Sequence, residues 1–232
     1  MNGLTGLILV LALMMPGRAS LLAAGREREP AIDQRIAIII DDFGNNMAGS
    51  DEMLQLEVPM TVAVMPFLPT TAEDASRAYR QGYDVLVHLP MEPKQGKPEW
   101  LGPGAIMASM SDAEVRAKVE EAIDNVPHAV GINNHMGSKI TGDERVMGII
   151  LDVCRDRGLF YVDSKTNYRS VVPKLCREKG LPLLENAIFL DDVYNTGHVT
   201  GQLQKAQKQA REQGPALRSA MWAFKEKLRL RP

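Results

Sequence analysis

The sequence predicts an α/β protein, a distorted (β/α) barrel of about six to seven parallel strands. Three observations lead to this prediction. From residue 35 onward, short apolar segments alternate with amphipathic segments. Several apolar segments have no polar face, as expected of parallel strands that are covered on both sides. Polar residues with metal-binding side chains follow these segments, at the edge where parallel strands end and functional groups gather.

Six strand–helix units are expected along the chain. The first strand covers residues 35–40 and reads Arg-Ile-Ala-Ile-Ile-Ile, a continuous apolar run typical of a buried strand. Ser111 and Glu114 have the spacing of a capping box and predict a helix that ends near Asn125. The other predicted strands are residues 60–65, 83–88, 130–132, 159–162 and 181–184 with 187–190; the other predicted helices are residues 48–56, 72–81, 143–157, 168–179 and 199–213.

The composition is that of a soluble globular chain. Among 232 residues, 27 are Lys or Arg and 29 are Asp or Glu, and 45% are apolar. These values exclude collagen-like and wholly disordered proteins. A net charge of −2 gives no indication of nucleic-acid binding, which usually requires a basic surplus. Such a surplus occurs only in residues 201–232, where eight basic residues and two Glu give +6 and leave −8 for residues 1–200.

The N-terminus contains an apolar run of thirteen residues, Leu4–Pro16, which is too short to span a bilayer comfortably. Its length fits the apolar part of a secretory signal. We therefore expect a signal peptide or signal anchor in residues 1–24 and a linker in 25–32. The protein would be exported, periplasmic or associated with the cell envelope, and would contact a membrane only through such an anchor. A buried N-terminal helix is the alternative.

The two cysteines and the absence of several common motifs exclude some classes of site and enzyme. Cys154 and Cys176 are 22 residues apart and no CxxC is present, which excludes a zinc pair of the usual spacing. A disulfide and two buried thiols both remain open. Walker, GxSxG, HExxH and GxGxxG motifs do not occur, so the commonest nucleotide-binding, serine-hydrolase and zincin assignments are excluded.

Polar residues follow five of the predicted strands. They are Asp41-Asp42, His88 with Glu92, Asn133-Asn134-His135, Asp163-Ser164 and Asp191-Asp192. Because parallel strands end at one edge, we expect these side chains to gather there. Two adjacent carboxylates repel unless a cation lies between them. A divalent metal would bind one aspartate and leave the other as a base, and one Asp with two His is a common catalytic zinc set.

Each of these residues also has a structural interpretation. Asp41 or Asp42 could cap a turn, and His88 could be a hydrogen-bonded core histidine. His135 could stabilise a tight loop, while Glu92 and the pair Asp191–Asp192 could be solvated carboxylates. Their joint occurrence at successive strand ends favours metal chemistry.

Four ordered motifs resemble the divergent polysaccharide deacetylase family over about residues 33–192. They are Ile38-Ile-Ile-Asp-Asp-Phe-Gly44, Val87-His-Leu-Pro-Met-Glu-Pro93, Gly131-Ile-Asn-Asn-His-Met-Gly-Ser138 and Phe160-Tyr-Val-Asp-Ser164. The resemblance implies a distorted (β/α) barrel of seven or so strands. It also implies metal-dependent removal of N-acetyl groups from glycans by an exported bacterial protein.

The resemblance also implies roles for individual residues. Asp41 matches the catalytic base and Asp42 the metal-binding aspartate of a paired-Asp motif. His88 matches a histidine ligand, and His135 is our candidate for the third ligand. Glu92 stands where a second histidine usually lies, so the ligand set is altered. The residues expected to line the pocket are Glu92, Asn134, Ser138, Asp163 and Ser164.

After residue 200 the resemblance fails. Family members usually continue into a strand that ends in Gly-His, whereas this chain runs from Gly214-Pro-Ala-Leu217 into Arg218-Ser-Ala-Met-Trp-Ala-Phe and a basic tail. We therefore expect the barrel domain in residues 33–200, followed by a C-terminal helix and an atypical tail in 201–232. A truncation or shifted frame would leave an open barrel edge without the usual late histidine. The alternative is a genuine amphipathic helix with apolar positions Leu217, Met221, Trp222 and Phe224.

The favoured function is a metal-dependent hydrolase that removes N-acetyl groups from a cell-envelope glycan, with zinc the favoured ion. The altered ligand set motivates a second hypothesis, a non-catalytic exported glycan-binding or scaffold protein. A phosphodiester hydrolase is a weaker third, because only Lys139 and Lys165 lie near the motifs. The sequence specifies neither the glycan nor the oligomeric state.

Overall fold

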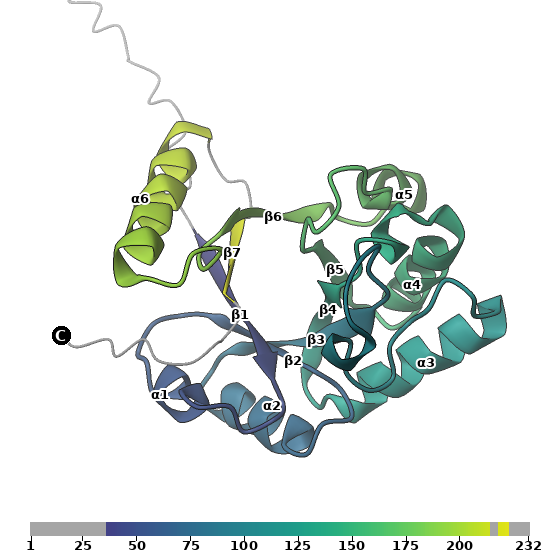
Figure 1. Cartoon of the computed structure of the whole chain (residues 1–232), viewed down its shortest axis with the longest axis horizontal. Helices are drawn as coiled ribbons and strands as arrows, with labels where there is room; N and C mark the ends of the chain where they lie inside the picture. The colour runs from purple at the N-terminus through teal and green to yellow at the C-terminus, as the bar shows by residue number, and fades with distance from the viewer. Residues whose placement is uncertain (1–35, 214–217, 223–232) are drawn as a thin grey trace, which may run out of the picture. The chain divides into compact units, whose positions relative to one another are not determined.

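A computed structural model of the chain describes residues 36–213 and 218–222. Seven parallel strands form a closed ring in which each strand is hydrogen-bonded to the next and the seventh to the first (Figure 1). A regular (β/α) barrel has eight strands, so the predicted distorted barrel is confirmed. The strands are β1 (Ala37–Phe43), β2 (Thr61–Val64), β3 (Asp84–Met91), β4 (Ala129–Met136), β5 (Phe160–Asp163), β6 (Leu184–Phe189) and β7 (Arg218–Trp222).

The helices lie outside the ring of strands (Figure 1). The predicted capping box is present at the start of α3, where the hydroxyl of Ser111 accepts from the backbone N–H of Glu114 and the Glu114 carboxylate accepts in return. The α-helices are α1 (Ser50–Leu54), α2 (Thr71–Arg80), α3 (Asp112–Asn125), α4 (Glu144–Asp156), α5 (Val172–Lys179) and α6 (Thr196–Gln213), and two 3₁₀ turns are η1 (Pro98–Trp100) and η2 (Ile140–Gly142). Within the described residues, no helix combines the length and apolarity needed to cross a membrane.

The apolar side chains divide into two clusters, one on each face of the strands. The larger cluster joins strand residues to helix residues outside the ring. The smaller cluster consists of Ile39, Ala63, Leu86 and Val162, from four different strands. Because side chains alternate along a strand, residues two positions after members of the small cluster point to the same face. Asp41 lies two positions after Ile39, and His88 two positions after Leu86. Both side chains therefore point inward at the carboxyl end of the barrel.

The C-terminal part of the barrel differs from the prediction. Residues 218–222 form β7, which pairs in parallel with both β1 and β6. The atypical tail therefore contains a strand. For residues 218–222, the prediction of an open barrel edge and the alternative prediction of an amphipathic helix are both wrong. Without β7, the strands β1 and β6 would each leave one edge unpaired. A short strand between them forms hydrogen bonds with the backbone groups of both edges. The predicted signal segment and linker lie outside the described residues.

The two cysteines are buried free thiols in the structure, on α4 and α5. Burial raises the pKa of the Cys154 thiol to about 12. Of the two arrangements left open by the sequence, the structure has the reduced one.

Two glycines allow a matched test of packing. A Cβ added at Gly131 in β4 would lie 2.7 Å from the Phe160 ring and 2.9 Å from its backbone oxygen, whereas one at Gly148 in α4 would meet nothing within 4 Å. Gly131→Ala should therefore lower the free energy of unfolding by about 1–3 kcal/mol, and Gly148→Ala should raise it by about 0.5–1 kcal/mol. Urea denaturation checks both, and equal effects would contradict the packing described here.

Candidate functional site

Three side chains from different strands meet at the carboxyl end of the barrel. The Nδ1 atom of His135 lies 3.1 Å from Oδ1 of Asp42, and Nε2 of His88 lies 3.3 Å from the same oxygen. The two histidine nitrogens are 3.2 Å apart. Within the described residues, this is the group of His, Cys, Asp and Glu side chains whose ligand atoms are close enough to share one ion. The structure thus brings together the three residues that were expected to bind a metal.

A bulge in β1 turns both aspartates toward this end of the barrel. Regular alternation would send the side chains of Asp41 and Asp42 to opposite faces. Instead, the register with β2 shifts between Ile40 and Phe43, and Asp42 adopts a left-handed conformation with φ of 66°. Aspartate tolerates this conformation better than most residues. Asp41 and Asp42 consequently line the same pocket, together with both histidines.

The outer nitrogen of each histidine faces a hydrogen-bond acceptor. Nδ1 of His88 lies 2.8 Å from the amide oxygen of Asn133, whose own nitrogen donates to Oδ1 of Asp41 at 2.9 Å. Nε2 of His135 lies 2.9 Å from the backbone carbonyl of Trp100. Because a carbonyl oxygen only accepts, each outer nitrogen carries the hydrogen. When an imidazole gives up its remaining proton, its inner nitrogen presents a lone pair toward Asp42 and the other ring.

A carboxylate oxygen that faces two imidazole nitrogens favours a positive charge between them, supplied either by a proton on His88 or by a metal ion. The buried Oδ1 of Asp42 accepts no well-directed hydrogen bond in the described part of the chain. A tetrahedral zinc ion with bonds of about 2.0–2.1 Å separates its ligand atoms by roughly 3.3–3.4 Å, close to the observed 3.1–3.3 Å. Two imidazole nitrogens and one carboxylate oxygen also match the chemistry of a catalytic zinc site, which leaves a fourth position open. The residues present therefore fit a divalent cation.

Burial and charge set the ionisation of the site. Burial raises the pKa of Asp41 to about 6. For Asp42, burial acts in the same direction, but the imidazoles of His135 and His88 outweigh it and hold the pKa well below its usual value. For His88, burial acts to lower the pKa, but the carboxylates of Asp41 and Asp42 outweigh it and raise the pKa to about 9. Asp42 and His88 thus favour their charged forms, whereas Asp41 gains a proton more readily than an exposed aspartate does.

Two of the five expected pocket residues lie near the triad. Asn134 lines the pocket that contains the triad. Ser138 instead lines a neighbouring pocket, where its hydroxyl accepts from the backbone N–H of Lys94.

The other three expected pocket residues lie away from the lining of the triad's pocket. Glu92 forms an ion pair with Lys139 and accepts from the backbone N–H of Ala108, so it fixes a loop and does not enter the ligand set. Asp163 and Ser164 are fully buried. The Ser164 hydroxyl donates to the backbone oxygen of Asn134, and its N–H donates to the Asn134 side chain. None of these three residues is among those that line the pocket of the triad.

Some residues of the site were missed by sequence reasoning, and others were named without a role. Thr166, Phe189 and Trp100 were missed, whereas Asp191 and Asn133 were named only as strand-end residues; Thr166, Phe189 and the buried Asp191 line the pocket of the triad, and Asn133 and Trp100 orient the histidines. Asp191 follows β6, and its place after a strand was the available signal. The role of Trp100 carries no sequence signal, because every residue has a carbonyl.

The sequence matches the pattern of the divergent polysaccharide deacetylase family over residues 38–221, which is most of the barrel. The chain belongs to the divergent polysaccharide deacetylase family. The match includes β7 up to Met221, so the family assignment extends beyond the region of the initial resemblance and covers every strand of the ring.

Two curated relatives and one solved structure extend this result. The chain is 33% identical to the uncharacterised protein YibQ of Escherichia coli (strain K12) over 86% of this chain and 61% of that protein. It is 33% identical to an uncharacterised protein of Haemophilus influenzae (strain ATCC 51907 / DSM 11121 / KW20 / Rd) over 79% of this chain and 65% of that one. The chain thus spans less than two thirds of the length of these relatives.

The crystal structure of an uncharacterised protein from Agrobacterium tumefaciens C58 has the same fold. It superposes with a TM-score of 0.73 at 19% identity and covers 82% of this chain and 76% of that chain. At this identity the similarity supports the deacetylase-like barrel and says nothing of activity.

Replacing Asn133 tests whether its side chain orients His88 for metal binding. Asn133→Leu removes the hydrogen bonds to both His88 and Asp41 without changing the three ligand atoms. We expect the affinity for zinc to fall by about 10- to 100-fold, as when other outer partners of metal ligands are lost. Competition with a chromogenic chelator measures the affinity. Asn186→Leu is the matched control, since Asn186 is also a buried asparagine but lies outside the site, and an equal loss of affinity there would contradict this role for Asn133.

Proposed function

We propose that the protein is a metal-dependent hydrolase that removes N-acetyl groups from a glycan of the cell envelope. The observation that carries this proposal is the meeting of three atoms able to bind a metal, from Asp42, His88 and His135, at ion-sharing distance. Membership of a polysaccharide deacetylase family supports the reaction class. The apolar run at Leu4–Pro16 supports export to the periplasm or envelope.

Asp42, His88 and His135 would hold the metal, with zinc favoured by the two imidazoles and the single carboxylate. When bound, such an ion supplies Lewis-acid chemistry, polarising a carbonyl and lowering the pKa of a water molecule. Asn133 and the Trp100 carbonyl keep both imidazoles in the required orientation.

Asp41 is placed to act as the base. Its carboxylate lines the pocket but lies outside the ligand set, and the amide of Asn133 fixes one oxygen. Asp41 would accept the proton of the water that attacks the acetyl carbonyl. The departing amine then needs a proton of its own. Asp191, the other carboxylate of this pocket outside the ligand set, would donate it.

Exposed aromatic rings near the site favour a sugar substrate. Trp100, whose carbonyl contacts His135, has a half-exposed side chain, and Phe189 in the pocket wall is 37% exposed. A flat aromatic face packs well against the C–H face of a pyranose ring while hydroxyls remain in water. The rim of the pocket thus offers the contacts that a glycan needs.

The decisive experiment measures acetate release from N-acetylglucosamine oligomers by the full chain, after dialysis against chelator and after reloading with zinc, cobalt or nickel. We expect release that depends on the added metal. Glycan binding that survives chelation, with no acetate released under any metal, would instead favour the non-catalytic scaffold. Release of acetate that is insensitive to chelation would contradict the proposed metal centre.

A further inference from the structure

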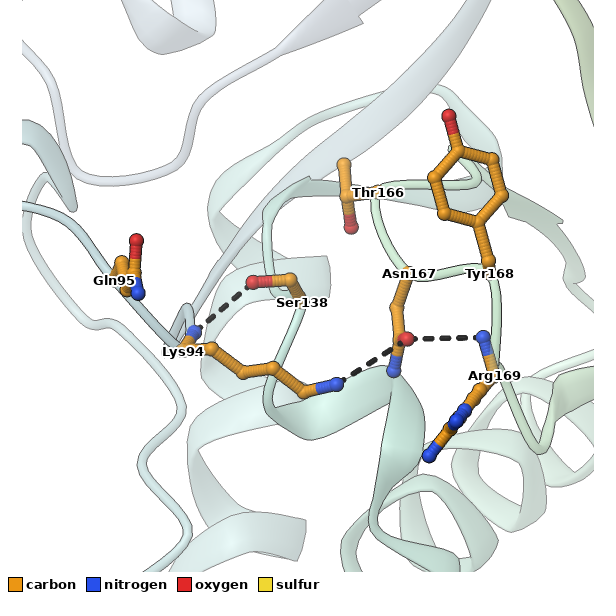
Figure 2. Close-up of a pocket in the computed structure, with 7 residues that line it drawn as sticks. All are labelled: Lys94, Gln95, Ser138, Thr166, Asn167, Tyr168 and Arg169. Carbon is orange, nitrogen blue, oxygen red and sulfur yellow. Dashed lines mark hydrogen bonds between the residues drawn. The ribbon is translucent and has the colours of Figure 1, made fainter.

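A second pocket lies beside the site on the same edge of the barrel. Its volume is about 470 Å³, and Thr166 lines both this pocket and the pocket of the triad. The wall includes the loop after β5, with Asn167 and Arg169, and the loop after β3, with Lys94 (Figure 2). A ligand that enters the first pocket can therefore extend into the second.

The second pocket carries two positive charges that are not neutralised. Lys94 and Arg169 form no ion pair with an acidic side chain of the described residues, so both charges remain available. The two other lysines at this edge are paired, Lys139 with Glu92 and Lys165 with Glu185. This contrast makes the second pocket a local positive site on a chain whose net charge is −2.

A buried amide lies between the two cations. The oxygen of Asn167 accepts from Nζ of Lys94 at 3.4 Å and from the backbone N–H of Arg169 at 3.0 Å (Figure 2). The Asn167 side chain is only 6% exposed, and its nitrogen has no hydrogen-bond partner within the described chain. An unsatisfied buried donor is costly. The oxygen of the same amide ties Lys94 to the loop that carries Arg169, which holds both cations on the wall of one pocket.

The rim of the second pocket also has a ring suited to a sugar. The side chain of Tyr168 is fully exposed and points away from the cluster of Lys94, Ser138 and Asn167 (Figure 2). An exposed aromatic ring beside unpaired cations combines a surface for stacking with donors for an anion.

We propose that this second pocket binds an anionic substituent, a carboxylate or a phosphate, on the sugar that neighbours the reacting N-acetyl sugar. The substrate would then be an acidic glycan, bound through Lys94 and Arg169. This inference rests on the proposed function in taking the ligand to be a glycan, and goes beyond it in assigning the charge of the substrate and the residues that recognise it.

Calorimetry with three tetrasaccharides tests the inference. One is a neutral N-acetylglucosamine tetramer, one alternates N-acetylglucosamine with glucuronate, and one carries 6-phosphates. We expect at least one acidic ligand to bind about 10-fold more tightly than the neutral tetramer, because charge-assisted hydrogen bonds are the strong ones. The preference should weaken as salt is raised, and the better acidic ligand identifies the anion.

The double variant Lys94→Gln/Arg169→Gln should bind all three tetrasaccharides alike. Lys205→Gln/Lys208→Gln, which removes the same charge from exposed positions of α6, should keep the preference. Equal binding of neutral and acidic ligands by the unmodified protein, or a preference that survives the first double variant, would overturn the inference. Because calorimetry measures binding alone, an acidic preference that depends on Lys94 and Arg169 would stand even if no acetate were released, whereas acetate release without that preference would support only the proposed function.

Discussion

Replacing His135 with alanine is expected to abolish retention of a divalent metal while the barrel remains folded. The side chain supplies one of three ligand atoms, and its loss leaves Asp42 and His88 alone. We expect the affinity for zinc to fall by more than the roughly 10- to 100-fold that follows loss of an outer partner. Elemental analysis after gel filtration measures the metal, and circular dichroism checks the fold.

His198→Ala is the matched control for this experiment. His198 is paired with Asp192 on the start of α6 and belongs to neither pocket, so its replacement should leave the metal content unchanged. If His135→Ala retained one equivalent of metal with unaltered affinity, the triad would not be the metal site, and the proposed hydrolysis would lose its main support.

Replacing Asp41 with asparagine is expected to lower kcat by about 10²- to 10⁴-fold, the usual contribution of a general base. Asparagine keeps an oxygen that can accept from Asn133 but cannot hold a proton taken from water. Metal content should therefore stay the same while turnover falls. Acetate release under saturating substrate, with metal measured in the same samples, separates these two effects.

Asp192→Asn is the corresponding control. Asp192 directly follows the pocket residue Asp191, yet its side chain is paired with His198 outside the pocket. We expect kcat close to that of the unmodified protein. A large fall in this control, or unchanged turnover in Asp41→Asn, would be incompatible with Asp41 as the base.

Most of the fold was predictable because the barrel strands have local signals. Residues 35–40 predicted β1 from their apolar run alone, and the capping box predicted the start of α3. The strand β7 was not predictable in the same way. Its five residues include Arg218 and Ser219 and have no clear alternation, and their extended form depends on pairing with β1 and β6, which are distant in sequence. Ring closure is a property of the whole barrel.

The three proposed ligands were predictable because their residue types are distinctive and follow successive strands. The arrangement around them was not. Alternation separates Asp41 from Asp42, and only a backbone bulge brings them together. The spacing of Glu92 from His88 gave no sign of its ion pair with Lys139, because that pair depends on the path of a distant loop. Asn133 was read only as part of a motif, although its amide joins His88 to Asp41.

The hydrogen bond from His135 to Trp100 uses the main chain of Trp100 and leaves the indole ring toward solvent. The side chain at position 100 can therefore change without loss of the hydrogen bond that orients His135. A different side chain at this position would change the surface beside the pocket and keep the acceptor of His135, whereas a deletion that shortens the loop would remove that acceptor. Among homologues, we accordingly expect the side chain at position 100 to vary and the length and backbone conformation of this loop to be conserved.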